Sequence, residues 1–84
     1  MNYVYILKSK KYNSIYVGCT NDLKKRFKEH NANESFFTKN KGPWEVRYYE
    51  AFYSKKDAFN REKQLEKHAR GIQELKKRLI NSLN

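Results

Sequence analysis

Two short runs of β-branched and aromatic residues near the start of the chain limit the folds that it can adopt. Residues 3–7 (Tyr-Val-Tyr-Ile-Leu) and residues 15–19 (Ile-Tyr-Val-Gly-Cys) flank a polar stretch, which is the pattern of a β-hairpin. The apolar residues of both runs share one face only if the numbers of paired residues add to an odd sum. That face then contains Val4, Ile6, Ile15 and Val17. The same register predicts that Tyr5 and Tyr16 lie together on the other face.

A helix is predicted directly after the hairpin. The capping side chains of residues 20–22 (Thr-Asn-Asp) precede a segment that extends to about His30. Residues at helical spacing form its inward stripe: Leu23, Arg26, Phe27 and His30. A guanidinium and an imidazole are therefore expected on or beside the face that packs on the sheet.

A loop and a third strand follow this helix. The Asn, Ser, Gly and Pro content of residues 31–44 predicts a loop, which Gly42 and Pro43 close. Residues 45–53 are rich in aromatic and β-branched side chains and predict a third strand. Three strands are enough for a stable sheet.

The rest of the chain is predicted to be helical. Ser54 and Asp57 resemble a capping box that opens a helix to about Ala69. Its inward stripe consists of Ala58, Glu62, Leu65 and Ala69, so that Glu62 interrupts an apolar face. Gly71 is expected to end this helix. Ile72, Leu75, Leu79 and Leu83 then predict a last amphipathic helix, and residues 1–84 a single α+β domain.

The charge of the chain favours a polyanionic partner. Lysine and arginine total 19 against 9 acidic residues, a formal net charge of +10. Hydrophobic residues at 38% and aromatic residues at 15% exclude a disordered basic tail. The single cysteine, Cys19, excludes an intramolecular disulfide and suits a reducing compartment. No apolar run approaches a signal sequence or the ~20 residues of a membrane span, so we expect a cytoplasmic protein without a membrane partner.

Five polar side chains are expected to point toward one side of the small sheet: Tyr5, Tyr16, Arg26, His30 and Glu62. Each has a structural explanation, since tyrosines pack with the hydroxyl at a rim, an arginine stem packs with its head in water, and Glu62 has Arg26 or a lysine as an ion-pair partner. Burying all five is costly without a functional return. The combination therefore favours a functional site.

These residues, in this order and at these spacings, resemble the GIY-YIG nuclease domain, and the short chain is similar to the small single-domain GIY-YIG proteins of bacteria. The matching positions are Tyr3-Val4-Tyr5, Tyr16-Val17-Gly18, Arg26, His30, Phe37-Thr38, Arg61-Glu62 and residues 70–76. The resemblance implies a GIY-YIG fold of the order β-β-α-β-α, with a three-stranded antiparallel sheet and an added C-terminal helix.

The resemblance also implies a reaction, the hydrolysis of a phosphodiester bond in DNA assisted by one Mg²⁺ or Mn²⁺ ion. It assigns activation of the attacking water to Tyr5, metal binding to Glu62 and stabilisation of the phosphate to Arg26. His30 is expected to orient Tyr5 or the water, and Tyr16 to position the phosphate or the water. The chemistry agrees, because a hard cation prefers carboxylate oxygen and a guanidinium binds phosphate through paired hydrogen bonds. With a reference pKa of about 10, Tyr5 needs a neighbour that lowers its pKa.

DNA contacts are predicted for the basic loop and the strand after it. The expected nucleic-acid-binding residues are Thr38, Lys39, Lys41 and Arg47. Phe36, Phe37 and Trp44 either stack on exposed bases or form a small core under the loop. The sequence thus predicts a DNA endonuclease or nickase of low sequence specificity with a role in repair or recombination.

Two other functions stay open, a catalytically silent nucleic-acid-binding module and a basic subunit of a ribonucleoprotein or repair assembly. We expect that no separate DNA-targeting domain accompanies this one. We therefore expect weak cleavage, a preference for structured or single-stranded DNA, or dependence on a protein partner for targeting.

Overall fold

The computed structural model describes residues 1–67 and 69–83, without the side chains of residues 67, 69 and 70, so the predicted inward position of Ala69 lies outside the described residues. The elements are β1 (Asn2–Ser9), β2 (Ile15–Thr20), α1 (Leu23–Asn31), β3 (Trp44–Phe52), α2 (Lys55–Lys67) and α3 (Ala69–Arg78). The predicted α+β class and element order are confirmed.

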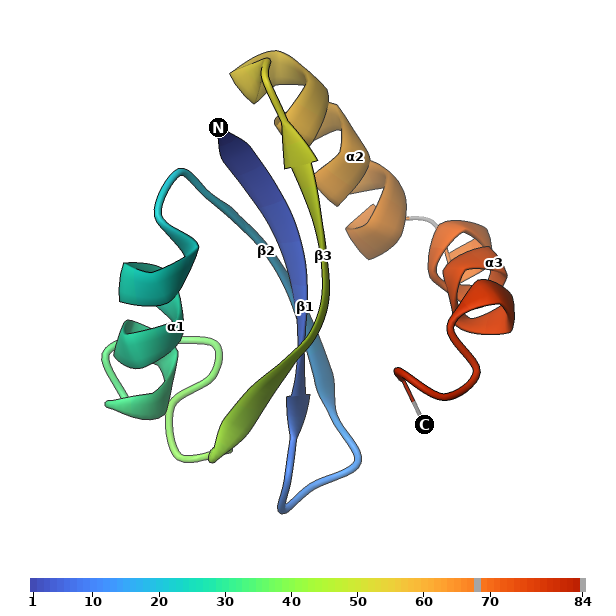
Figure 1. Ribbon diagram of the computed structural model, residues 1–84. Coiled ribbons are helices and arrows are strands. Elements are labelled where there is room, and N and C mark those ends of the chain that lie inside the picture. Colours follow the sequence, from blue (N-terminus) through green and yellow to red (C-terminus); the bar gives the residue numbers. More distant parts are fainter. Residues whose placement is uncertain (68, 84) are drawn as a thin grey trace.

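A three-stranded antiparallel sheet in the order β2-β1-β3 forms the middle layer. Helix α1 covers one face, and α2 and α3 cover the other (Figure 1). Val4 pairs with Cys19 and Ile6 with Val17, which is the odd-sum register that the apolar pattern predicts. Because neighbouring side chains alternate between faces, Tyr5 points toward α1.

Each face of the sheet has its own small core. The core under α2 and α3 consists of Val4, Ile6, Val17, Ala58, Leu65, Leu75 and Leu83. The core under α1 consists of Tyr5, Leu7 and Trp44, with Tyr16, Leu23, Phe27 and Val46 packed against it. The core under α1 is rich in aromatic side chains that carry polar atoms. These atoms seek hydrogen-bond partners when they are buried, so polar groups can pack within this core.

Strand β3 contains a bulge that the sequence pattern does not reveal. Leu7 pairs with Val46 while its neighbour Ile6 pairs with Tyr48, so that Arg47 is an extra residue in the ladder. The Arg47 guanidinium donates a hydrogen bond to the Ser82 carbonyl at 3.0 Å and lies 3.3 Å from a Glu45 oxygen. These contacts attach the last turn of the chain to the sheet, and the binding of nucleic acid by Arg47 stays a prediction.

The helix boundaries correct two expectations. The Ser54 hydroxyl accepts a hydrogen bond from the Asp57 backbone N–H at 3.3 Å, as expected for the start of α2. Gly71, however, lies inside α3 and ends no helix. A Cβ atom there would come within 2.6 Å of the Gln64 carbonyl oxygen, so Gly71 allows α3 to approach α2. Helix α3 ends at Arg78, and the predicted helical residue Leu83 reaches the core from the segment that follows the turn of residues 80–82. Among the described residues, no helix is long and apolar enough to cross a membrane.

Candidate active site

Three buried side chains form a hydrogen-bonded chain beneath α1. Tyr5 comes from the central strand, and its hydroxyl oxygen lies 2.8 Å from Nε2 of His30. His30, in the last turn of α1, has its Nδ1 atom 2.7 Å from the hydroxyl oxygen of Thr38, in the loop before β3. All three side chains are almost completely shielded from solvent. Each therefore depends on the next for its hydrogen bond.

Burial keeps both titratable members of this chain neutral. It lowers the pKa of His30 to about 4, with a further contribution from the Arg26 cation. Burial also raises the pKa of the Tyr5 hydroxyl, and the nearby Tyr16 adds to this shift, whereas Arg26 opposes it. Activation of water by Tyr5 was expected to need a lowered Tyr5 pKa, whereas the protein alone shifts this pKa upward. A neutral His30, however, has a ring nitrogen that can accept the phenolic proton.

The lowered His30 pKa predicts acid sensitivity of the fold. Because the folded-state pKa of about 4 lies below the unfolded value of 6.5, the unfolded chain binds this proton first as the pH falls. The stabilisation is complete above pH 6.5 and is lost toward pH 4, by roughly 3 kcal/mol. We expect urea unfolding at pH 7, 5.5 and 4 to show this loss in the wild type and a clearly smaller one in His30→Gln. Parallel pH profiles for the two proteins would contradict it.

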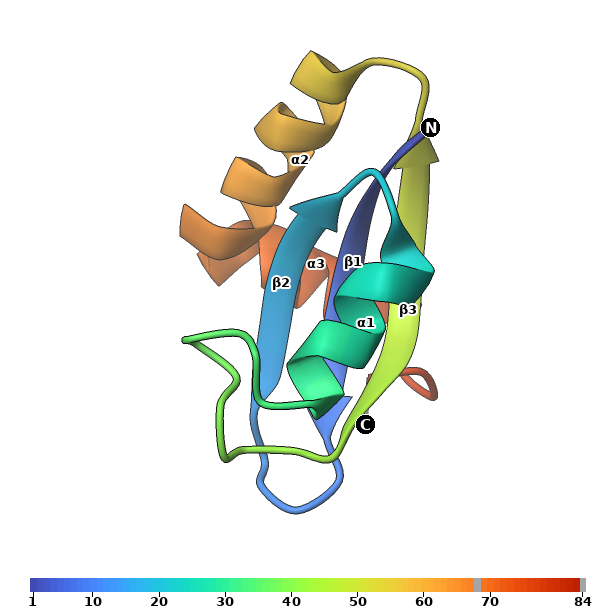
Figure 2. The ribbon, with the colours of Figure 1, turned by 90° about the vertical axis from the view of Figure 1, so that its left-hand side faces the viewer.

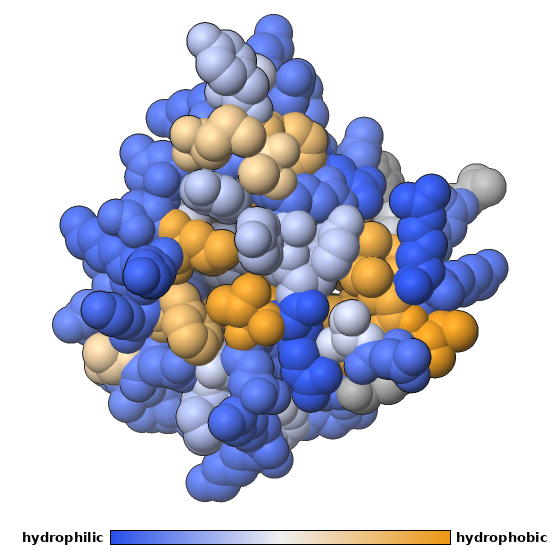
Figure 3. Space-filling view, viewed as in Figure 1, coloured by the Kyte–Doolittle hydropathy of each residue, from blue (hydrophilic) through white to orange (hydrophobic). Residues whose placement is uncertain are grey.

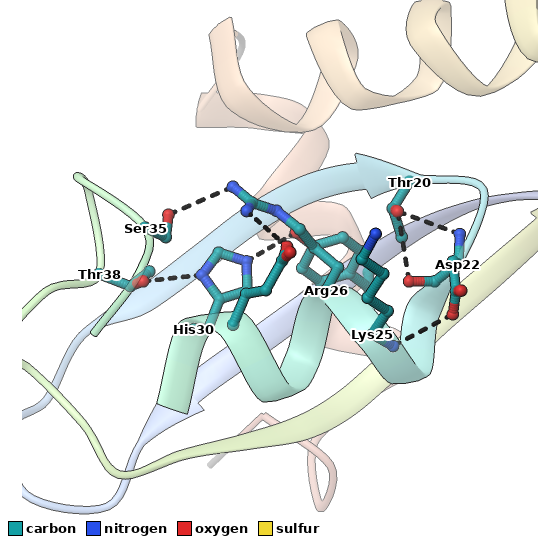
Figure 4. Close-up of polar contacts among 9 residues, drawn as sticks. Thr20, Asp22, Lys25, Arg26, His30, Ser35 and Thr38 are labelled. Carbon is teal, nitrogen blue, oxygen red and sulfur yellow. Dashed lines mark hydrogen bonds and ion pairs between the residues drawn. The ribbon is translucent and has the colours of Figure 1, made fainter. Parts of the chain in front are cut away.

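Tyr16 and Arg26 complete the polar cluster on this face. The Tyr16 ring centroid lies 4.9 Å from that of His30 and 6.3 Å from that of Tyr5. One guanidinium nitrogen of Arg26 donates to Glu29 at 3.0 Å and the other to the Ser35 hydroxyl at 3.3 Å (Figure 4). The Arg26 side chain remains 33% exposed, so it is fixed in position yet accessible to an anion.

Glu62 lies in a different layer from the other four residues. It is half-buried on α2, across the sheet from α1, whereas the sequence analysis expected one shared side. Helical spacing shows which side of α2 packs inward but does not show which face of the sheet the helix covers. The ion pair considered between Glu62 and Arg26 is absent, because Arg26 pairs with Glu29.

The edge strand β2 lies between Glu62 and the Tyr5 side chain, but Glu62 still acts electrostatically on both tyrosines. A Cβ atom on Gly18 would collide with the Tyr5 hydroxyl and with its ring carbon Cζ, so the absence of a side chain there leaves space for the phenol. Glu62 contributes to the raised pKa of Tyr5, of Tyr16 and of Cys19, although burial is the largest cause in each case. The five residues thus surround an edge strand from both faces.

Glu62 is suited to bind a metal ion whose other ligands are water and oxygen atoms of the substrate. Burial, followed by the neighbouring Glu66, raises the pKa of Glu62. The described residues contain no group of three or more His, Cys, Asp or Glu side chains that would enclose a metal. Mg²⁺ is commonly held by one or two carboxylates together with water and substrate phosphate oxygens. A single carboxylate at the rim of the site meets that requirement.

The predicted DNA-binding residues in the loop of residues 32–43 differ in their exposure to solvent. Lys39 and Lys41 are exposed, as a phosphate contact requires. Thr38, in contrast, is completely buried against His30, and its contact with nucleic acid stays a prediction. Trp44 is also buried and belongs to the core, whereas Phe36 and Phe37 are exposed.

Two partners of Arg26 escaped the sequence analysis. Glu29 stands three residues after Arg26 on the same helix, a spacing at which ion pairs form, so it was detectable in principle. Ser35 had no signal, because its contact with Arg26 depends on how the loop folds back over α1.

Comparison with known proteins shows the family of this chain. Residues 1–79 match the GIY-YIG catalytic domain, and the chain belongs to the GIY-YIG family. Membership implies a nuclease-type function, and nucleases of this family typically use divalent metals.

Among proteins of this family, the chain is similar to the small UPF0213 proteins. It is 45% identical to one from Clostridium perfringens over 71 residues, which cover 83% of this chain and 75% of that protein. It is 39% identical to YazA of Bacillus subtilis, with 88% of this chain and 75% of that protein covered. The solution NMR structure of a UPF0213 protein from Bacillus halodurans aligns with a TM-score of 0.54 at 35% identity, covering 89% of this chain and 81% of that one.

Proposed function

We propose that the protein is a divalent-metal-dependent DNA endonuclease or nickase of low sequence specificity, acting in DNA repair or recombination. The observation that supports it most is the buried chain from Tyr5 through His30 to Thr38, whose first two members lie near the accessible Arg26. A net charge of +10 favours binding to the phosphate backbone through counterion release, which is largely independent of sequence.

Arg26 has the first role in the proposed reaction. Its guanidinium donates to the oxygens of the scissile phosphate and stabilises the charge that develops there. Glu29 and Ser35 hold the guanidinium before the substrate arrives, which limits the reorganisation that the reaction needs. Tyr16, beside both Tyr5 and His30, positions the phosphate or the attacking water through its hydroxyl.

Tyr5 and His30 move the proton. Tyr5 passes its phenolic proton to Nε2 of His30 and takes a proton from the attacking water, whose oxygen forms the new bond to phosphorus. The bond from phosphorus to the leaving sugar oxygen breaks at the same time, and that oxygen takes a proton from solvent water. This requires the tautomer in which Nδ1 of His30 carries hydrogen and donates to Thr38. Glu62 would hold Mg²⁺ or Mn²⁺, which when bound neutralises phosphate charge and favours hydroxide over water.

Thr38 offers a test of the tautomer. Thr38→Val keeps the shape but removes the acceptor for Nδ1–H, so we expect nicking to fall about tenfold or more, in line with the usual contribution of proton-transfer groups. Thr38→Ser keeps the hydroxyl and should retain most activity. The pH–rate profile of the Val variant should also shift, because His30 loses a partner. A Val variant with the rate and pH profile of the wild type would refute this role.

Conversion of supercoiled plasmid to open-circular or linear DNA tests the proposal directly. We expect conversion with Mg²⁺ or Mn²⁺ and none with chelator. Binding without conversion in either metal would favour the catalytically silent nucleic-acid-binding module. Conversion that persists in chelator would contradict the metal dependence.

A further inference from the structure

Two aromatic rings project into solvent from the loop between α1 and β3. Phe36 is 87% exposed and Phe37 is 69% exposed. The rings contact each other edge to face, with centroids 5.4 Å apart. On the face seen in Figure 3, hydrophilic side chains predominate and surround a few apolar patches. A solvent-exposed aromatic pair on a hydrophilic protein marks an interaction site.

The loop that carries these rings is attached firmly to the candidate active site. The flanking residues Ser35 and Thr38 are buried, and they hydrogen-bond to Arg26 and His30 respectively. The indole N–H of Trp44 donates to the Thr38 carbonyl at 3.2 Å. The segment that carries the rings is therefore held in place at both ends, which lowers the entropic cost of binding.

The position of the loop places the rings beside the expected path of the substrate. Phe36 directly follows Ser35, whose hydroxyl lies 3.3 Å from the Arg26 guanidinium. Figure 2 shows the loop passing outside the free edge of β2, the strand around which the site is built. The exposed Lys39 and Lys41 follow in the same loop and supply positive charge. Aromatic rings beside cations are the arrangement that binds unpaired nucleic acid, because bases stack on the rings while phosphates contact the cations.

We propose that Phe36 and Phe37 form a stacking platform for an unpaired base of the DNA strand whose phosphate Arg26 holds. This inference rests on the proposed function for its substrate and adds a preference for single-stranded or locally unpaired DNA. Bases inside an intact duplex are stacked on one another and do not reach the rings. A second copy of the chain is a poorer occupant, because two rings offer roughly 150–250 Å² each against the ~800 Å² per partner of a stable interface.

The experiment compares binding of a single-stranded oligonucleotide and of the same sequence in a duplex, by fluorescence anisotropy in chelator. The double variant Phe36→Ala/Phe37→Ala should lose about tenfold or more in affinity for the single strand and change little for the duplex. Phe36→Tyr/Phe37→Tyr keeps both rings and should bind like the wild type. Tyr53→Ala removes another exposed aromatic side chain, 94% exposed and just after β3, and should leave both affinities unchanged.

Several results would overturn the platform. Unchanged single-strand affinity in the double variant would do so, as would equal losses for single strand and duplex. Sedimentation showing a wild-type dimer and a monomeric variant would instead make the rings an interface between copies. An oligoribonucleotide that binds more tightly than the DNA would exclude DNA as the source of the base.

A second measurement needs no variant. A 2-aminopurine base in the single strand should change its emission when it stacks on the wild-type protein, and unchanged emission in a saturated complex would overturn the inference. Because chelator prevents cleavage, the binding result is independent of the nuclease proposal. Ring-dependent single-strand binding by a protein that cleaves neither plasmid nor single-stranded DNA with Mg²⁺ or Mn²⁺ would refute the nuclease function alone.

Discussion

We expect Glu62→Gln to abolish Mg²⁺-dependent nicking while DNA affinity stays the same or rises slightly. The substitution removes a proposed metal ligand and a negative charge with almost no change in volume, and it leaves the packing of the core under α1 unchanged. An amide oxygen is a far weaker ligand for a hard cation than a carboxylate. Plasmid nicking over a Mg²⁺ titration measures the first effect, and binding in chelator measures the second.

A neighbouring carboxylate provides the matched control. Glu66 is exposed on the same helix, one turn after Glu62, so Glu66→Gln changes the net charge identically. It should nick at nearly the wild-type rate. Equal nicking by the wild type and Glu62→Gln, with only an altered melting temperature, would make Glu62 a structural residue and favour the silent binding module.

Tyr5→Phe should lower nicking by about 10² to 10⁴, the usual contribution of a positioned acid–base group. The Phe ring fills the same space in the core under α1, so the fold is retained. The change does remove the hydrogen-bond partner of the buried His30 Nε2 atom, at a cost of about 1–3 kcal/mol. Single-turnover nicking, with circular dichroism and thermal unfolding of the same samples, separates lost chemistry from lost structure.

Tyr49 is the matched control for this substitution. It pairs with Tyr5 across the sheet and is exposed, so Tyr49→Phe removes a phenolic hydroxyl on the neighbouring strand. We expect its nicking rate to remain close to that of the wild type. If both Phe variants lost activity equally, the effect would come from the sheet surface rather than from a specific Tyr5 hydroxyl.

Local sequence patterns predicted the hairpin register and the shared face of Tyr5 and Tyr16, because strand alternation leaves one solution that buries Val4 and Ile6. They also predicted that α1 directs Arg26 and His30 inward, because helical spacing aligns them with Leu23 and Phe27. In both cases the spacing of residues that are close together in the sequence was enough to predict the direction of the side chains.

Features that depend on long-range packing escaped these patterns. The face of the sheet that α2 covers determines the side from which Glu62 approaches the site. No local residue spacing predicts which face that is. The bulge at Arg47 and the burial of Thr38 against His30 arise from contacts between separate segments. The same limit applied to Phe36 and Trp44, since composition alone does not distinguish an exposed aromatic residue from a buried one in a loop.

Because the site is built around the edge strand, we expect heat to abolish the activity at a lower temperature than it unfolds the protein. Strand β2 is paired on one side only, whereas β1 is paired on both and forms part of each core. Edge strands open locally at a lower free-energy cost than central ones. A brief detachment of β2 would carry Tyr16 and Gly18 away from Tyr5 while the rest of the molecule stayed intact. Heating should therefore inactivate the protein reversibly at temperatures where its helices are still folded.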